Sequence, residues 1–263
     1  MQNFYIPETF QMIRSFLLYS SIEYIELIPT HTPIQNTDSL IGRNGYVPAE
    51  SQIPRDVFGR KMQLLAQINF THSDTPNPFP LKGLLQFYVS NTCVETKQHY
   101  QGVLDQNDFA VIYIENPNGN YKNTNRPQIN AISKYPIQQT LQLNFKHAIE
   151  PVSKFDYRFE DYIPKKEIEK LPIFKELNVD DLYLQHYSGA QHKIGGYAYF
   201  IQDDFRRHSH ELQRYNTLLF QIISNDAQGI MWGDSGVIKY FINDEDLKNL
   251  SFHNTMMYVE DFT

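Results

Sequence analysis

Two stretches of the chain alternate apolar and polar residues, which is typical of half-buried β-strands. They are Tyr24–Pro29 (YIELIP) and Leu141–His147 (LQLNFKH). Two short apolar runs, Leu64–Phe70 (LLAQINF) and Leu218–Ser224 (LLFQIIS), indicate strands in the interior of a sheet. The dipeptide Asn118–Gly119 suits a tight hairpin turn. The pattern therefore predicts an antiparallel sheet.

Helical patterns occur in two places. In the segment from Thr9 to Ser20, Phe10, Ile13 and Leu17 share one face, which predicts an amphipathic helix packed on a sheet. The Lys- and Glu-rich segment Pro164–His186 predicts one or two short helices interrupted at Pro172. The fold class is α+β, with a predominantly antiparallel sheet and a few peripheral helices.

The chain also resembles itself. Four blocks recur in the same order: Ile41–Gly42 with Gly45–Tyr46 as Ile194–Tyr197 (IGGY), Leu64–Asn69 as Leu218–Ile223, Lys82–Val89 as Ser235–Ile242, and Val111–Glu115 as Met256–Glu260. Their spacings are 153, 154, 153 and 145 residues. We expect an internal duplication with halves 1–130 and 131–263, which share one core because each is too small to fold well alone.

The sequence GDSG at Gly233–Gly236 resembles the nucleophile turn of a serine hydrolase. In the duplication, however, Ser235 stands where Lys82 stands in the first half. The glycine that follows, Gly83 or Gly236, is common to both halves and is expected to have φ > 0. Val237 follows this turn, and no supporting histidine motif occurs. The stretch is therefore interpreted as the entry to a strand.

Composition limits the class of protein. The chain has 263 residues, of which 41% are hydrophobic, and 23 Lys and Arg stand against 30 Asp and Glu, a net charge of -7. This size allows a sizeable core, and the charge disfavours a nucleic-acid partner. The single cysteine, Cys93, has no metal-binding spacing around it. No signal peptide or membrane span is recognisable. We expect a cytoplasmic protein without a cofactor or a bound metal.

Two segments are candidate binding sites, one for an anion and one for a metal ion. The loop with Gly195, Gly196 and Tyr197 could approach an anion, but it lacks the spacing of dinucleotide and P-loop sites, so a tight turn is favoured. His208 and His210 share a face only in a strand, and their charged surroundings favour a solvated segment.

Four further residues remain candidates for ligand binding. Gln67 and Gln221 are amides inside apolar strands, so each needs hydrogen-bond partners. A structural bond near a pseudo-twofold axis is favoured, and a ligand cleft between the halves is the alternative. Trp232 and Asp234 beside the glycine turn are explained by a core-edge Trp and a turn-capping Asp, or else by a recognition surface.

Taken together, the blocks LLAQINF, PFPLKGLLQFYV, HKIGGYAYF, LLFQI and IMWGDSGVIKYFI, with Asp246–Leu247 after them, resemble the bacterial YwqG-like family, a group of unknown function. The resemblance covers nearly the whole chain and implies an α+β fold with an internal duplication and no established activity. The first-half sequence IGRNGY departs from the compact IGGY of the second half. A site in that glycine loop would therefore be lost from the first half.

No nucleophile–base set, metal spacing or phosphate loop emerges from the sequence. The leading hypothesis is a non-enzymatic module that binds a small ligand or a partner protein, and neither nucleic acid nor membrane. The alternative is a hydrolase or transferase with a site between the halves, in which Asp234, His192 or Asp203 serve as acid and base groups.

Overall fold

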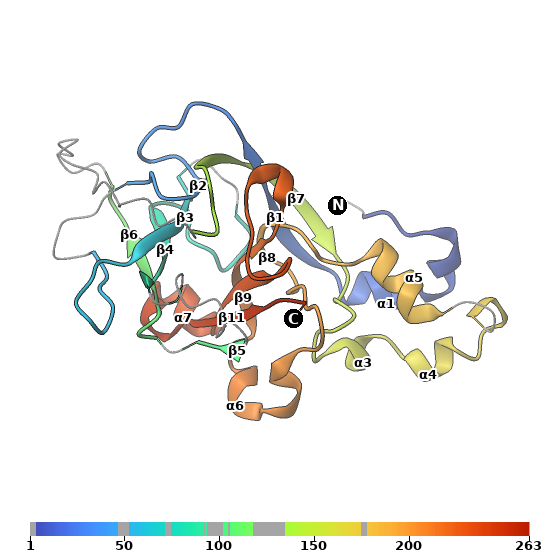
Figure 1. Cartoon of the computed structure of the whole chain (residues 1–263). Coiled ribbons are helices and arrows are strands. Elements are labelled where there is room, and N and C mark those ends of the chain that lie inside the picture. The colour runs from blue at the N-terminus through green and yellow to red at the C-terminus, as the bar shows by residue number, and fades with distance from the viewer. Residues whose placement is uncertain are drawn as a thin grey trace.

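The computed structural model describes residues 4–46, 53–71, 75–91, 93, 102–104, 106–117, 135–174 and 178–262. Over these residues the protein is built on one antiparallel sheet with short helices at one side (Figure 1). No helix in this part of the chain combines the length and apolarity needed to cross a bilayer. The expected class, α+β with a mostly antiparallel sheet, is confirmed.

The sheet contains eleven strands in the order β5-β11-β10-β9-β8-β1-β7-β2-β3-β4-β6 within the described residues. They are β1 (Ile22–Thr30), β2 (Leu40–Ile41), β3 (Gln63–Asn69), β4 (Leu84–Val89), β5 (Gly102–Val103), β6 (Phe109–Ile114), β7 (Leu141–Glu150), β8 (Lys193–Gly195), β9 (Thr217–Ile223), β10 (Val237–Ile242) and β11 (Met256–Glu260). The strands expected from the four apolar stretches are β1, β3, β7 and β9.

The two alternating stretches form the centre of the sheet. β1 pairs with β7 along its whole length, from Ile22 opposite Glu150 to Thr30 opposite Gln142. On its other side β1 pairs with β8, and β7 pairs with β2. Each of the two long strands therefore pairs with the other on one side. On its other side it pairs with a short strand that is distant in the sequence. The two ends of the sequence are interleaved in one sheet.

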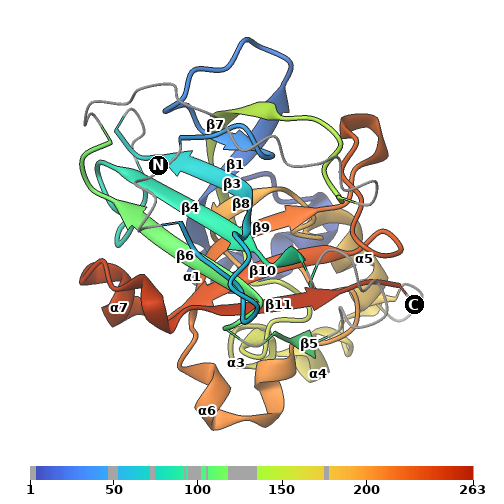
Figure 2. The same ribbon diagram turned by 60° about the vertical axis from the view of Figure 1, so that its left-hand side comes forward.

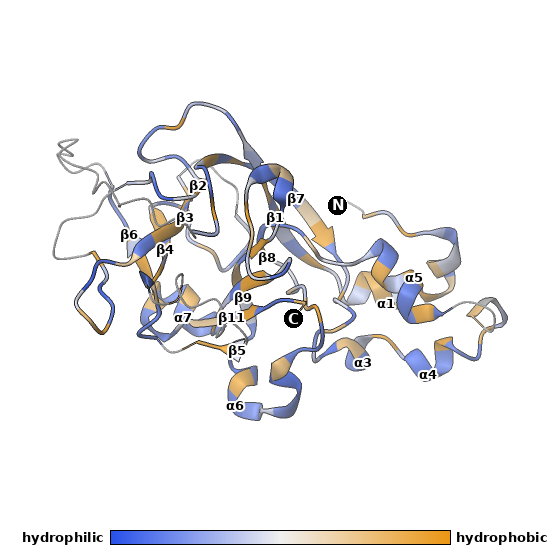
Figure 3. Ribbon diagram, viewed as in Figure 1, coloured by the Kyte–Doolittle hydropathy of each residue, from blue (hydrophilic) through white to orange (hydrophobic). Residues whose placement is uncertain are grey.

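The sheet curls, and its inner face encloses the main hydrophobic core. In Figure 2, β4 and β6 cross in front of β9, β10 and β11. The ring of Phe87 on β4 stacks on Phe220 of β9 at 4.5 Å and lies 4.9 Å from Tyr240 of β10. Strands at opposite ends of the sheet therefore contact each other through their side chains. Figure 3 shows hydrophobic residues along β4 and β9.

Two smaller clusters cover the outer face. Leu40, Met62, Leu64 and Tyr88 form one over β2, β3 and β4, whereas Ala198, Phe200, Leu218, Phe241 and Met256 form the other near β9, β10 and β11. Because successive side chains of a strand point to opposite faces, β3, β4, β9 and β10, which lie between these clusters and the main core, are buried on both sides. This explains why β3 and β9 are continuous apolar runs rather than alternating ones.

The helices that gather at one side of the sheet are defined here as the helical lobe (Figure 1). They are η1 (Glu8–Ile13), α1 (Arg14–Tyr19), α3 (Phe159–Tyr162), α4 (Lys165–Ile168), η3 (Pro172–Phe174) and α5 (Val179–His186). The other helices in the described part of the chain are η4 (Phe205–His208), α6 (His210–Gln213), η5 (Asp226–Gln228), α7 (Asp244–Lys248) and η6 (Phe252–Asn254).

The N-terminal helix differs from its expectation in two respects. It is a 3-10 helix up to Ile13 and an α-helix only from Arg14. Phe10 is fully buried as expected, but its ring contacts Phe174 at 6.0 Å and Tyr183 at 5.8 Å. The expectation that this helix packs on the sheet is therefore wrong: its buried face packs against other helices, which periodicity alone cannot specify. The hairpin at Asn118–Gly119 and the boundary at residue 130 lie outside the described residues.

Candidate functional site

The side-chain amide of Gln67 holds the loop that precedes β3. Its Nε2 donates to the carbonyl oxygens of Asn36 and Asp38 at 3.1 and 2.8 Å, and its Oε1 accepts the N–H of Tyr46 at 2.9 Å. The side chain is fully buried on the outer side of the strand. Since an unpaired buried amide costs about 1–3 kcal/mol, these bonds account for a glutamine inside an apolar strand.

Gln221 on β9 makes the same three kinds of bond. Its Nε2 donates to the carbonyl oxygens of Gly189 and Gln191 at 3.0 and 2.8 Å, and its Oε1 accepts the N–H of Tyr199 at 2.7 Å. Both glutamines are thus bonded internally. They do not bond each other, because β2, β7, β1 and β8 separate the two strands in the sheet. Their shared partners are the backbone groups of two loops, and Gln67 Oε1 also accepts Gln86 Nε2 at 2.6 Å.

A second matched pair lies at the start of β2 and β8. Ser39 Oγ accepts the N–H of Asn69 at 2.8 Å, and its carbonyl oxygen accepts the N–H of Leu143 at 2.9 Å. His192 accepts from Ile223 N–H through Nδ1 at 3.2 Å, and its carbonyl oxygen accepts from Leu27 N–H at 2.8 Å. A hydroxyl and an imidazole therefore provide the same acceptor on the two sides of the sheet.

The glycine loop is occupied by the protein's own carboxylate. Glu150 Oε1 accepts the N–H of Tyr197 at 2.7 Å, and a Cβ atom on Gly196 would lie 2.2 Å from the same oxygen. Gly195 has φ 71° and packs against the backbone of β1, and Tyr197 OH donates to Ser20 O at 2.6 Å. The loop is a tight turn that admits a carboxylate, and Glu150 supplies it.

The GDSG turn departs from its expectation. Gly83 has the expected positive φ, 83°, but on the other side of the sheet the positive values fall on Gly233, 49°, and Ser235, 56°. The prediction of positive φ for Gly236 is therefore wrong. That residue is a glycine because a Cβ atom there would lie 2.5 Å from Glu260 O. The constraint is close approach of a neighbouring strand, which a turn pattern does not reveal.

Trp232 and Asp234 lie on this turn in different environments. Trp232 is buried in the main core, and its Nε1 has no hydrogen-bond partner in the described part of the chain. Asp234 is exposed, and its backbone N–H donates to Asp261 Oδ2 at 3.4 Å. The carboxylate that bonds the turn is therefore Asp261, and the capping role expected for Asp234 is wrong.

The predicted ligand-binding residues do not come together in one place. They are Gln67, Gly195, Gly196, Tyr197, Gln221, Trp232 and Asp234. The two glutamines bind separate loops, the glycine loop encloses Glu150, and the last two residues belong to the turn before β10. Of the five that have a side chain, only Asp234 is exposed.

The acid and base candidates of the enzymatic alternative are also apart. His192 is buried, and its Nε2 lies 3.0 Å from Gln228 Oε1 while Nδ1 accepts from the backbone. Burial lowers the pKa of this histidine, although the bond to Gln228 opposes the shift. Asp203 forms an ion pair with Arg207 at 3.1 Å, and Asp234 lies on the GDSG turn. His208 and His210 are exposed, as expected for a solvated segment.

Two buried lysines, which the sequence analysis did not identify, anchor the outer face. Lys193 on β8 donates to Glu150 at 2.7 Å, and Lys239 on β10 donates to Glu260 and, at 2.8 Å, to Tyr199 O. Both lysine side chains are fully buried. Burial lowers the pKa of Lys239 to about 8 against the attraction of Glu260. The sequence does contain a signal for Lys239: it is a lysine in the middle of an apolar strand, VIKYFI, and such a charge needs a buried partner.

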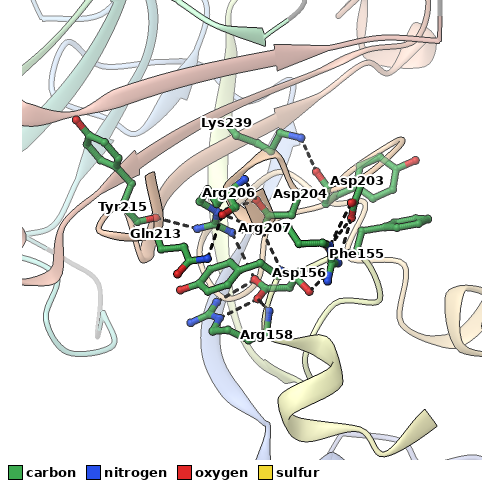
Figure 4. A network of polar contacts seen from close by, with 12 residues as sticks. Phe155, Asp156, Arg158, Asp203, Asp204, Arg206, Arg207, Gln213, Tyr215 and Lys239 are labelled. Atoms are coloured by element: carbon green, nitrogen blue, oxygen red, sulfur yellow. Dashed lines mark hydrogen bonds and ion pairs between the residues drawn. The ribbon is translucent and has the colours of Figure 1, made fainter. Parts of the chain in front are cut away.

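A larger ionic cluster connects the segment just before α3 with η4, and Lys239 lies near it (Figure 4). Arg206 Nη2 lies 2.7 Å from Asp204 and 3.5 Å from Asp156, and Arg158 Nε lies 2.8 Å from Asp156. Burial would raise the pKa of Asp156, but the hydrogen bond and charge of Arg158 outweigh it and hold the pKa low. Every charge here has a partner, so the cluster fixes the strand connections instead of presenting a reactive group.

Metal coordination has no obvious location in the described residues. No group of three or more His, Cys, Asp or Glu side chains among them is placed to hold an ion. Cys93 is buried, and burial raises the pKa of its thiol, which keeps it protonated.

The N-terminal helical segment also exposes apolar side chains to solvent. Met12 on η1 and Phe16 and Tyr19 on α1 are 62%, 40% and 80% exposed. Of the thirteen large hydrophobic residues that the described chain exposes, six lie between Tyr5 and Ile22. We name Met12, Phe16 and Tyr19 the exposed stripe. Tyr19 also contacts Tyr162 of α3 at 5.9 Å, which joins the stripe to the rest of the helical lobe.

The fold and these groups define an α+β protein with a mostly antiparallel curled sheet, whose buried glutamines and lysines bind its own loops. Residues 39–260 match the family described as Domain of unknown function (DUF1963), and the chain belongs to that family. No curated protein matches the chain.

Proposed function

We propose that the protein is a non-enzymatic binding module whose target is a partner protein. The observation that carries this proposal is the exposed stripe. Aromatic residues and methionine are enriched in protein interfaces, whereas a helix on the surface of a monomer ordinarily presents polar residues to water. The three exposed side chains, carried by the consecutive helices η1 and α1, have the composition of an interface core.

The positions of the ionisable groups support the absence of catalysis. Acid–base chemistry needs two groups within reach of one substrate. His192 has both ring nitrogens in internal contacts, and Asp203 is paired with Arg207. A catalytic role for either would require breaking a contact that holds a loop. Nucleic acid and membrane remain outside the proposed partners.

The test uses a random dodecapeptide phage library on the immobilised protein. We expect enrichment of peptides that bind saturably in fluorescence anisotropy and lose at least tenfold in affinity against the variant Met12→Ser/Phe16→Ser/Tyr19→Ser. Leu81→Ser is the matched control, since Leu81 is 76% exposed outside the helical lobe. Failure to enrich, or peptides that bind the triple variant equally well, would contradict the proposal.

A second arm addresses the enzymatic alternative. Thermal-shift screening with metals, nucleotides and sugars identifies compounds that bind, and each of them is then tested for turnover. We expect no product. Reproducible product formation that Asp234→Asn abolishes would establish a hydrolase or transferase and would overturn the non-enzymatic assignment.

We also propose that the sheet arose by duplication of β1–β6 as β7–β11. The backbone partners of Gln67 and Gln221 support it, because each lies 153 residues from its counterpart. The strand order supports it as well. The strands β6-β4-β3-β2-β7 follow one another in the sheet as their proposed counterparts β11-β10-β9-β8-β1 do. In the strand registers, Ile114 lies opposite Leu84 and Glu260 lies opposite Val237. If Leu84 corresponds to Val237, then Ile114 corresponds to Glu260, and Val111 corresponds to Met257 instead of Met256.

The narrower assignments rest on the sequence. We propose membership of the bacterial YwqG-like group on the resemblance of the quoted blocks. A cytoplasmic location is supported by the single cysteine, which leaves no internal disulfide to require an oxidising compartment.

A further inference from the structure

The exposed stripe is not needed to hold its own helices in place. The buried residues Phe10, Ile13 and Leu17 already pack η1 and α1 into the helical lobe. Phe16 and Tyr19 are three residues apart on α1, so they are neighbours on the surface of that helix. Apolar side chains that gather at the surface, rather than occurring singly, mark a site of association.

One acid and one base accompany the stripe. Glu8 in η1 and Arg14 at the start of α1 are the only charged residues from Phe4 to Ile22, so this segment has no net charge in a chain of net charge -7. Both side chains are exposed. Within the described residues neither side chain forms an ion pair or a hydrogen bond. Both charges can therefore meet a partner without breaking a contact inside the chain.

We propose that two copies of the chain form a two-fold symmetric dimer through the exposed stripe. The proposal rests on the proposed function, because it names a second copy as the partner of that same stripe. In a two-fold interface every contact occurs twice, since residue i of one copy meets residue j of the other and j meets i. Glu8 of each copy pairs with Arg14 of the other, and the two stripes pack against each other.

The charges favour a second copy over an unrelated protein. A surface with one acid and one base is complementary to itself under a two-fold rotation, whereas a strongly charged partner gains nothing from a segment without net charge. Two copies of net charge -7 repel each other as whole molecules. The segment that contains the stripe lets them approach at lower cost, because it adds no net charge of its own to the contact.

The size of the stripe sets the strength of the dimer. Its three side chains offer roughly 350 Å² per copy, if a whole aromatic side chain has about 200 Å² and each contributes its exposed fraction. Tyr5, Leu18 and Ile22 are also exposed on the same segment. Two stripes together thus bury roughly 700 Å², and even with these neighbours the interface stays near the lower limit of about 1,200 Å² for stable complexes. We expect a reversible dimer with a Kd in the micromolar range.

The test is sedimentation equilibrium of the full chain at concentrations from about 1 to 500 µM. We expect the average mass to rise from that of a monomer toward that of a dimer, and Met12→Ser/Phe16→Ser/Tyr19→Ser to raise the Kd at least tenfold. Leu81→Ser, which alters an exposed residue outside the helical lobe, should change the Kd less than twofold. A wild-type protein that stays monomeric throughout, or a dimer that the triple variant does not weaken, would overturn the proposal.

Charge exchange tests the symmetry of the contact. Glu8→Arg and Arg14→Glu each place like charges opposite each other in both ion pairs, so each variant alone should dimerise at least tenfold more weakly than the wild-type protein. An equimolar mixture joins a copy with two bases to a copy with two acids, and we expect a heterodimer of nearly wild-type affinity. Melting temperatures establish that both variants are folded. A mixture that associates no better than its components would overturn the pairing of Glu8 with Arg14.

Two controls make the result specific. Glu245→Arg makes the same charge change at an exposed position of α7, outside the helical lobe, and should alter the Kd less than twofold. A weakening as large as that of Glu8→Arg would show that the ion pair is not the cause and would overturn its assignment. The peptide selection is done below the Kd of the dimer, where the stripe is accessible. A monomeric protein that still binds peptides through the stripe would overturn the dimer and leave the proposed function standing.

Discussion

The outer face of the sheet differs between its two sides. Over β2, β3 and β4 it is covered by the apolar side chains Leu40, Met62, Leu64 and Tyr88. Over β8, β9 and β10 it combines an apolar cluster with the buried ion pairs of Lys193 with Glu150 and of Lys239 with Glu260. Both sides fix a loop above the strands, so the comparison shows which interactions that task requires.

One bond is common to both sides although the donor differs. Gln86 Nε2 donates to Tyr46 O at 2.7 Å, and Lys239 Nζ donates to Tyr199 O at 2.8 Å. An amide therefore suffices to hold such a carbonyl. The lysine adds a charge that must be neutralised by Glu260, and a buried pair gains little over a neutral alternative because both charges lose water. The ion pairs therefore require two buried charges to be matched, whereas the loop contact itself needs only a neutral donor.

The largest effect is expected from breaking one pair. Lys239→Gln keeps a donor for Tyr199 O but leaves the Glu260 carboxylate buried without a cation. We expect the free energy of unfolding to fall by about 3–5 kcal/mol, measured by urea denaturation. Lys146→Gln is the control: Lys146 pairs with Glu26 at 2.8 Å while its side chain is 63% exposed, and it should change stability little. Equal losses in the two variants would remove the distinction between buried and exposed pairs.

The glutamines should behave alike on the two sides. Gln67→Leu and Gln221→Leu each remove three hydrogen bonds to backbone groups of the loop above the strand. We expect each to lower the free energy of unfolding by about 2–4 kcal/mol, with the two values within about 1 kcal/mol of each other. A loss confined to one variant would show that the two clamps are not equivalent.

Replacing the pair as a whole should cost less than breaking it. Lys239→Gln/Glu260→Ile gives β10 and β11 the residue types that β4 and β6, their proposed counterparts, carry at Gln86 and Ile114. We expect a stability within about 2 kcal/mol of the wild-type protein, the remaining loss coming from Ile201 N–H, which donates to Glu260 Oε1 at 2.8 Å. A double variant less stable than Lys239→Gln alone would mean that Glu260 acts independently of the lysine.

The smallest effect concerns pH. The folded protein holds the pKa of His192 below that of an exposed histidine, about 6.5, so below pH 6.5 the unfolded chain binds a proton that the folded chain does not. Stability therefore falls as the pH drops from 7 toward 5, by at most about 1.4 kcal/mol per pH unit. His192→Ser, which introduces the residue found at position 39, should remove that part of the dependence. Parallel pH curves for the two proteins would contradict it.

The strands were predictable because burial leaves a local record. The alternation of Tyr24–Pro29 and the apolar runs at Leu64 and Leu218 specify strands whatever their neighbours are. Their neighbours were not predictable, since the pairing of β1 with β8 joins residues about 170 positions apart. The buried face of α1 was identified by period, but not the helices against which it packs.

The candidate residues show the same limit. Gln67 and Gln221 were recognised as amides that need partners, and the partners proved to be loop carbonyls. Whether Gly236 is a glycine for its φ angle or for the approach of Glu260 depends on a strand contributed later in the chain. The residues of the exposed stripe are as apolar as the buried residues of the same helices, so only the fold distinguishes them.

The position of β1 between β7 and β8 has a consequence for synthesis of the protein. β1 leaves the ribosome early, yet its partner β8 begins at Lys193, 163 residues after Thr30. At about 5–20 residues per second this interval lasts roughly 8–30 s, during which the edge of β1 that pairs with β8 has no native partner. The nascent chain therefore needs a chaperone or a transient local structure to protect this strand, and the sheet can close only when translation is nearly finished.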